Sequence, residues 1–173
     1  MKKLWSLSVL LIPIIVLLLF TAGCPPIDTT GSGSFMYDGT TYSLTNGALE
    51  YCGVGDFDLV LASSGLNAAL WEGTGDVVWF DLVSPSTIGK PGRYDWAGTD
   101  GFLLWAGGIN FNFNADTDTG TRLDADSFRA ASEDHVTISV QGRTYDIEFS
   151  VTFMDGTVLT GSYTGPLPVV YEN

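Results

Sequence analysis

The chain has 173 residues, with 20 Asp and Glu against 7 Lys and Arg, so its formal net charge is −13. A surface this acidic repels phosphate backbones, which excludes nucleic acid as an expected partner. The length suits one domain that buries a core of its own.

The N-terminal segment has the order of a secretory leader. A positive start at Lys2 and Lys3 is followed by an uncharged apolar run from Leu4 to Phe20 and then by small residues. The run has 17 residues, at the lower limit of about 17–25 for a membrane-spanning helix, and Pro13 interrupts it. We therefore expect a cleaved signal peptide over residues 1–23 rather than a retained membrane helix.

The leader ends at a cysteine. The motif Thr21-Ala22-Gly23-Cys24 resembles the lipobox of bacterial lipoproteins, although Leu is usual where this chain has Thr21. The resemblance implies that a diacylglycerol is attached to Cys24 and that acyl chains anchor the protein in a membrane. Pro25 in place of Asp implies, by the same resemblance, the outer membrane. The alternative is plain cleavage that leaves Cys24 as a free thiol.

Cleavage would leave 150 residues and, with both leader lysines lost, a net charge of −15. Residues 24–34 have little to bury, and we expect the lipidated cysteine and a flexible tether there. A single β domain is expected over residues 35–173. If Cys24 is lipidated, Cys52 has no disulfide partner, and its apolar, strand-like context predicts a small buried side chain.

The first part of the domain reads as strands and tight turns. Asp38-Gly39 predicts a hairpin between strands at Phe35–Tyr37 and Thr40–Leu44, and Asn46-Gly47 predicts a second turn. A strand of alternating apolar residues is expected over 57–61.

The middle part is less regular. Residues 63–75 are expected to be a loop with one isolated tryptophan, Trp71. Asp76–Ser84 is apolar on both faces, which predicts a central strand covered on both sides. Gly89–Gly92 predicts a turn, and Arg93–Trp96 begins another strand.

One or two strands are expected between Gly101 and Phe113. Alternation would place Ile109, Phe111 and Phe113 on one face and the intervening asparagines on the other. The segment Asp124–Ala131 fits a short helix with an acidic start.

The clearest pattern comes last. Apolar residues alternate over 136–140 and 145–153, and a further strand is expected over 157–167, with turn signals at Gln141-Gly142 and Asp155-Gly156. Such strands form an antiparallel meander with one wet face. With no long helix expected, the fold class is all-β, an antiparallel β-sandwich or a calycin-like β-barrel.

Short pieces spread over most of this domain carry a family resemblance. They are Tyr37–Tyr42, Gly73–Asp76, Pro91–Tyr94, Tyr145–Ile147, Asp155-Gly156 and Gly161–Gly165. The pieces are similar to small secreted lipoproteins of Bacteroidetes-type bacteria, mostly uncharacterised all-β proteins of which some are described as calycin-like. The resemblance implies an envelope location and an all-β fold, and it transfers no catalytic residue.

The side chains offer little for catalysis. His135 is the single histidine, and its place beside Glu133 and Asp134 predicts a solvated turn residue. There is no Gly-x-Ser-x-Gly elbow, and one His and one Cys cannot supply a zinc site. We therefore expect no enzyme. The alternative is an enzyme that acts on polysaccharide through paired carboxylates.

One acidic segment is a candidate calcium site. Asn114, Asp116 and Asp118 offer side-chain oxygens at alternate positions, which lets them converge on one hard cation. Compared with an EF-hand loop, Gly120 comes one place late and the closing Glu is absent. A solvated acidic loop is therefore the alternative, and no other cofactor is expected.

Four tryptophans remain after cleavage, at positions 71, 79, 96 and 105. Because sugars stack on such rings, we expect glycan contact through Trp71, exposed in its loop, together with Trp105. The alternative is that Trp79 fills the core and the others cap its edges. The sequence thus predicts a lipid-anchored, non-catalytic binding or structural module of the cell envelope, whose partner is a glycan or another envelope protein.

Overall fold

The computed structural model describes residues 30–96, 101–123 and 133–171. These residues form twelve strands and no helix, and none of them lies in a helix that could cross a membrane. The strands are β1 (Thr30–Tyr37), β2 (Thr40–Tyr51), β3 (Asp56–Ala62), β4 (Leu66–Asn67), β5 (Glu72–Val83), β6 (Gly92–Trp96), β7 (Leu103–Asn114), β8 (Thr119–Leu123), β9 (His135–Gln141), β10 (Thr144–Thr152), β11 (Val158–Gly165) and β12 (Val169–Tyr171).

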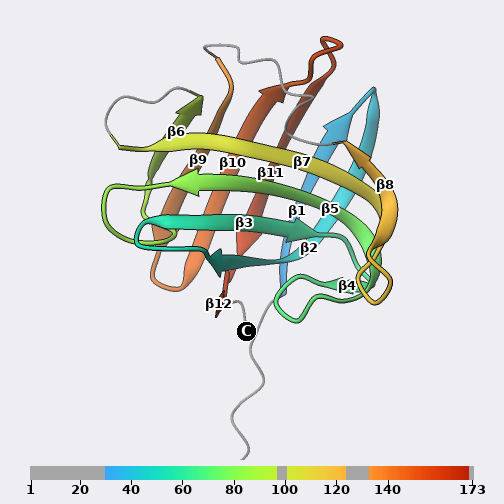
Figure 1. Ribbon diagram of the computed structural model, residues 1–173, viewed down its shortest axis with the longest axis horizontal. Coiled ribbons are helices and arrows are strands. Elements are labelled where there is room, and N and C mark those ends of the chain that lie inside the picture. Colours follow the sequence, from blue (N-terminus) through green and yellow to red (C-terminus); the bar gives the residue numbers. More distant parts are fainter. Residues whose placement is uncertain (1–29, 97–100, 124–132, 172–173) are drawn as a thin grey trace, which may run out of the picture.

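Nine of these strands close into a barrel (Figure 1). The hydrogen-bonded order β5-β3-β2-β1-β11-β10-β9-β6-β7 returns to β5 through the pairing of β5 with β7. Strands β3, β5 and β7 cross the front of Figure 1 nearly at right angles to β1, β10 and β11 behind them. The predicted all-β fold is confirmed, and the closed ring makes it a barrel.

The barrel interior is filled by one apolar cluster to which all nine strands contribute. Alternation puts every second side chain of a strand inside. The largest buried side chains include Tyr94 and Tyr163. Their hydroxyls are satisfied, because Tyr94 donates to the Lys90 carbonyl at 2.7 Å and Tyr163 donates to the Pro166 carbonyl at 3.2 Å.

A second, smaller cluster lies on the outer side of β2, β3, β5 and β7. It contains Ala48, Val60, Ala62, Leu66, Ala68, Val77 and Phe113. The segment between β3 and β5, which includes β4, covers it. Strand β5 therefore has apolar contacts on both sides, with Val78 in the inner cluster and Val77 in the outer one, as the sequence predicted.

The turn predicted at Asn46-Gly47 is wrong, because both residues lie inside β2. The Asn46 side chain connects β2 to the β4 segment. Its amide nitrogen donates to the Leu66 carbonyl and its oxygen accepts from the Ala68 N–H, both at 2.8 Å. At Gly47 a Cβ would meet the side chains of Leu61 and Leu167. The two residues thus serve tertiary contacts rather than a change of direction.

The segment assigned to the tether is in part a strand. Strand β1 begins at Thr30, where the sequence placed the domain boundary after residue 34. A Cβ at Gly31 would overlap the Tyr163 ring, and one at Gly33 would overlap the β11 backbone. The glycines therefore allow β1 to lie close against β11. From composition alone, the same glycines had suggested a flexible tether.

Several local predictions are confirmed. Asp38 and Gly39 both have positive φ, 47° and 73°, as a tight hairpin requires. Strands β9, β10 and β11 form the expected meander. The short strand β12, which pairs in parallel with the end of β2, was not expected. The leader, Cys24 and the helix expected over 124–131 lie outside the described residues.

The prediction that Cys52 is buried is wrong. Cys52 follows the last residue of β2 and is exposed, because the chain turns there toward β3. Desolvation of its sulfur, together with the nearby carboxylates of Asp58 and Asp56, nevertheless raises the pKa of the thiol to about 11. The thiol therefore stays protonated at neutral pH.

We expect Asn46→Ala to lower the free energy of unfolding by about 1–3 kcal/mol, because the Leu66 carbonyl and the Ala68 N–H each lose a partner. Urea unfolding of the soluble domain measures this. Ser43→Ala, at an exposed position of the same strand, is the control and should change stability by less than about 0.5 kcal/mol. Equal effects of the two substitutions would contradict the role given to Asn46.

In a Cys24→Ser chain at pH 8, Cys52 of the folded protein should react with iodoacetamide about tenfold more slowly than Cys52 of the protein unfolded in urea. The thiolate fraction falls about 100-fold when the pKa rises from 9 to 11, and the greater nucleophilicity of the more basic thiolate recovers about tenfold. The folded rate should keep rising toward pH 11. A rate that levels off near pH 9 would show that the pKa is not raised.

Candidate functional site

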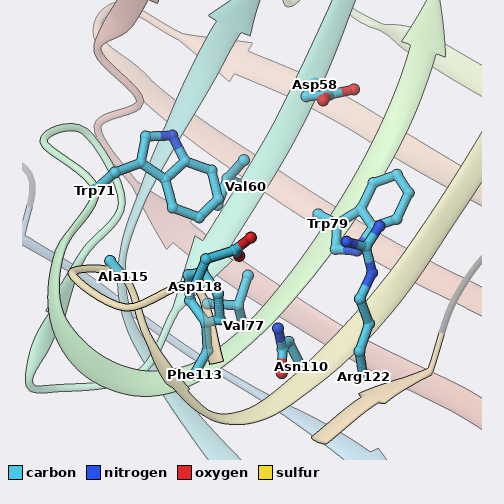
Figure 2. Close-up of a pocket in the computed structure, with 10 residues that line it drawn as sticks. All are labelled: Asp58, Val60, Trp71, Val77, Trp79, Asn110, Phe113, Ala115, Asp118 and Arg122. Atoms are coloured by element: carbon cyan, nitrogen blue, oxygen red, sulfur yellow. The ribbon is translucent and has the colours of Figure 1, made fainter. Parts of the chain in front are cut away.

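An open cleft lies on the outer surface of the barrel, over β3, β5 and β7 (Figure 2). Its volume is about 460 Å³, within the range of about 300–1,000 Å³ that small-molecule sites occupy. It is lined by Asp58, Val60, Trp71, Val77, Trp79, Asn110, Phe113, Ala115, Asp118 and Arg122.

The floor of the cleft depends on a bulge in β7. Alternation predicted that Ile109 and Phe113 share a face, but Ile109 lies inside the barrel and Phe113 lies in the outer cluster. The change occurs at Asn112, which has a φ of +49°, where the register of β7 against β8 shifts. The Asn112 N–H donates to Asp76 Oδ1 at 3.0 Å, which holds the bulge in place.

Strand β5 is irregular at the same level. Its register against β7 shifts between Gly75 and Val77, around Asp76. The Asp76 N–H donates to Ser63 Oγ at 2.8 Å, and the Ser63 N–H donates to the Asp76 carbonyl at 2.9 Å. Asp76 thus connects the covering segment, β5 and β7, and it fixes the edge of the cleft.

Trp71 enters the cleft from the residues just before β5. Its backbone has a φ of +51°, and its ring packs edge-to-face on Phe113 with centroids 5.9 Å apart. Trp71 is partly buried rather than exposed, while its neighbour Leu70 is 59% exposed. The sequence predicted an exposed Trp71, but the structure packs its ring on Phe113. A binding role for Trp71 stays a prediction.

Trp79 forms the other aromatic wall of the cleft. It lies on β5 between Val78 and Phe80, which face the interior, so its own side chain faces outward. The interpretation that Trp79 fills the core is therefore wrong. Its ring lies over Gly108 of the paired strand, where a Cβ would overlap the indole. The Arg122 guanidinium lies 5.8 Å from the ring centroid, in cation–π range.

Trp105, the partner predicted for Trp71, is not among the residues that line the cleft. It lies near the start of β7 and is 65% exposed. Trp96 packs against the inner cluster. The structure therefore places Trp71 and Trp79 in the same cleft. The sequence feature that could have indicated the position of Trp79 is Gly107-Gly108, because Gly108 pairs with Trp79 and leaves room for its ring.

Polar groups surround the two rings. Asp58 comes from β3, Asn110 from β7, Asp118 from the β7–β8 turn and Arg122 from β8. Figure 2 shows the Arg122 guanidinium in front of Trp79 and the Asn110 amide nitrogen directed up from the floor, with Asp58 at the far end. The arrangement offers both hydrogen-bond donors and acceptors beside an apolar surface.

Asp58 belongs to a row of carboxylates across neighbouring strands. Its Cα partners are Glu50 on β2 and Asp81 on β5. Burial, and then the nearby Asp56 carboxylate, raises the pKa of Asp81. This side of the outer surface therefore has a negative field, which opposes anionic ligands.

The candidate calcium residues lie in the β7–β8 hairpin. Asn114 Oδ1 accepts the Thr117 N–H at 3.1 Å, so it closes the turn. Asp116 is exposed, and Asp118, with a φ of +49°, lies at the cleft. In the described part of the chain, no three His, Cys, Asp or Glu side chains come close enough to hold a metal. Calcium binding here stays a prediction.

His135 is separate from the cleft. It is the first residue of β9 and is partly buried, and its Nδ1 lies 2.8 Å from the Glu133 carbonyl oxygen. It does not belong to the residues that line the cleft.

No protein-family model, curated protein or solved structure matches this chain. The function is therefore argued from the geometry of the barrel and its cleft.

Proposed function

We propose that this chain is a lipid-anchored protein of the cell envelope, held in the outer membrane, whose barrel is a non-catalytic binding module for a glycan. The anchor rests on the resemblance of Thr21–Cys24 to a lipobox. The glycan rests on one observation, that Trp71 and Trp79 line the same open cleft.

Two indole rings beside Val77 give the cleft an apolar surface that matches the apolar face of a sugar ring. Burial of this apolar surface by a ligand contributes about 25 cal/mol per Å². The polar rim suits the other face of the ligand. Asp58 and Asp118 accept hydrogen bonds, and the Asn110 amide donates.

The cleft is held ready for its ligand. Trp71 packs on Phe113, and Trp79 contacts Gly108 and has the Arg122 guanidinium 5.8 Å from its ring centroid. Binding to such a site orders few side chains, which reduces the entropic cost of association. The row of carboxylates at Glu50, Asp58 and Asp81 disfavours strongly anionic glycans, so neutral and amino sugars fit best.

We expect Trp79→Ala to weaken glycan binding about tenfold, since loss of about 55 Å² of buried apolar contact costs about 1.4 kcal/mol. A glycan array identifies the ligand for the soluble Cys24→Ser domain, and calorimetry measures its affinity. Trp105→Ala removes a tryptophan outside the cleft and should bind as the unaltered domain does.

Thermal melts of both variants accompany the affinities, so that loss of binding is separated from loss of folding. A Trp79→Ala domain that melts normally and binds with full affinity would contradict the glycan site. So would Trp105→Ala if it alone abolished binding.

A second candidate function is favoured by a specific observation. Asp58 and Asp118 line the same cleft as the two tryptophans, and an enzyme that cleaves polysaccharide needs two carboxyl groups about 5–10 Å apart across the scissile bond. We place binding first because the ring pair explains the cleft without a reaction.

The two functions differ in the products. We expect no release of reducing sugar from a bound polysaccharide beyond that seen with Asp58→Asn or Asp118→Asn, measured by a reducing-end assay. If the unaltered domain releases reducing sugar and both substitutions lower that rate about 100-fold or more, the chain is an enzyme.

A further inference from the structure

We propose that the barrel sits on the bilayer by one end, which consists of the start of β1, the β4 segment, the β9–β10 turn and β12. This inference rests on the proposed lipid attachment at Cys24. We call this end the seat.

The length of chain between the anchor and the barrel limits their separation. Only five residues lie between Cys24 and Thr30, the first residue of β1, so six Cα–Cα steps join them. Six extended residues span at most about 20 Å. Strand β1 then runs eight residues away from that point, or about 25 Å. The start of β1 is therefore held near the bilayer, and the far end of β1 can stand well away from it.

Strand pairing shows which elements share the seat. Thr30 pairs with Asn46 of β2, whose side chain holds the Leu66 carbonyl of β4. Ser32 pairs with Thr164 of β11, and Thr164 pairs with Asp146, just after the β9–β10 turn. In Figure 1, β4 and β12 lie at the lower edge with the start of β1.

The far end of the barrel is formed by two hairpin tips. They are Asp38-Gly39 and Asp155-Gly156, and the ring of Tyr37 packs on that of Phe153, 5.2 Å away, where the two hairpins meet.

The seat has the side chains that a bilayer interface accepts. Leu70 and Tyr171 are 59% and 66% exposed, and Val169 is also exposed. Arg143 is exposed in the β9–β10 turn. Aliphatic and tyrosine side chains partition into the interface, and an arginine pairs with lipid phosphate.

The front surface is excluded as the membrane contact by its charge. Asp58 and Asp81 lie there on neighbouring strands, and they would face lipid phosphates if the barrel lay on that side. A barrel seated by its end keeps the cleft open to one side. Trp71, next to Leu70, then lies on the membrane-proximal side of the cleft.

The experiment uses the lipidated chain in vesicles of phosphatidylethanolamine and phosphatidylglycerol that contain a headgroup nitroxide lipid. Cys52→Ser removes the native thiol, and a fluorophore is placed at Leu70→Cys, Arg143→Cys or Asp155→Cys. Quenching should be roughly threefold stronger at positions 70 and 143 than at 155, given a distance difference of about 25 Å. The soluble Cys24→Ser form of each labelled chain, mixed with the same vesicles, should not be quenched.

Flotation of the vesicles separates the two proposals. A chain that does not float with the lipid overturns the anchor at Cys24 and the seat with it. A chain that floats but is quenched equally at positions 70, 143 and 155, or most strongly at 155, overturns the seat and leaves the anchor standing.

Discussion

The pairing of β5 with β7 is the contact on which the rest of the structure depends. It closes the ring of nine strands, and without it the inner faces of the front strands would face water. Gly108 on β7 leaves room for the Trp79 ring of β5, which a Cβ there would overlap. Closure leaves β5 and β7 without a free edge along most of their length, which also removes a route to aggregation.

The same pairing creates the cleft, because it is not regular. The register shifts at Asp76 and at Asn112 move Phe113 from the inner to the outer side of the sheet. Bulges of this kind redirect side chains and occur often beside binding sites. The Asp76 carboxylate accepts from the Asn112 N–H and so connects the two irregular places. A perfectly alternating β7 would have left Trp71 without the ring on which it packs.

The sequence predicted those parts of the fold that local chemistry decides. Asp38-Gly39 and the meander from β9 to β11 follow from turn residues and strict alternation, and both were correct. Asn46-Gly47 and the Gly-Ser-Gly-Ser segment carry the same local signals and were misread. In each case the local structure is determined by a contact between residues far apart in the sequence. These contacts are Asn46 with Leu66 and Gly31 with Tyr163, and no local sequence pattern reveals them.

The candidate site shows the same division more sharply. Trp71 was singled out because no strand face required it, but its ring packs on Phe113 of the outer cluster. The alternative interpretation placed Trp79 in the core, but strand alternation between Val78 and Phe80 places it outside. A tryptophan flanked by two inward apolar residues needs an outer surface, and a glycine pair on the next strand supplies the space. The cleft could have been located by comparing neighbouring strands, because a tryptophan on one strand lies opposite a glycine pair on the next.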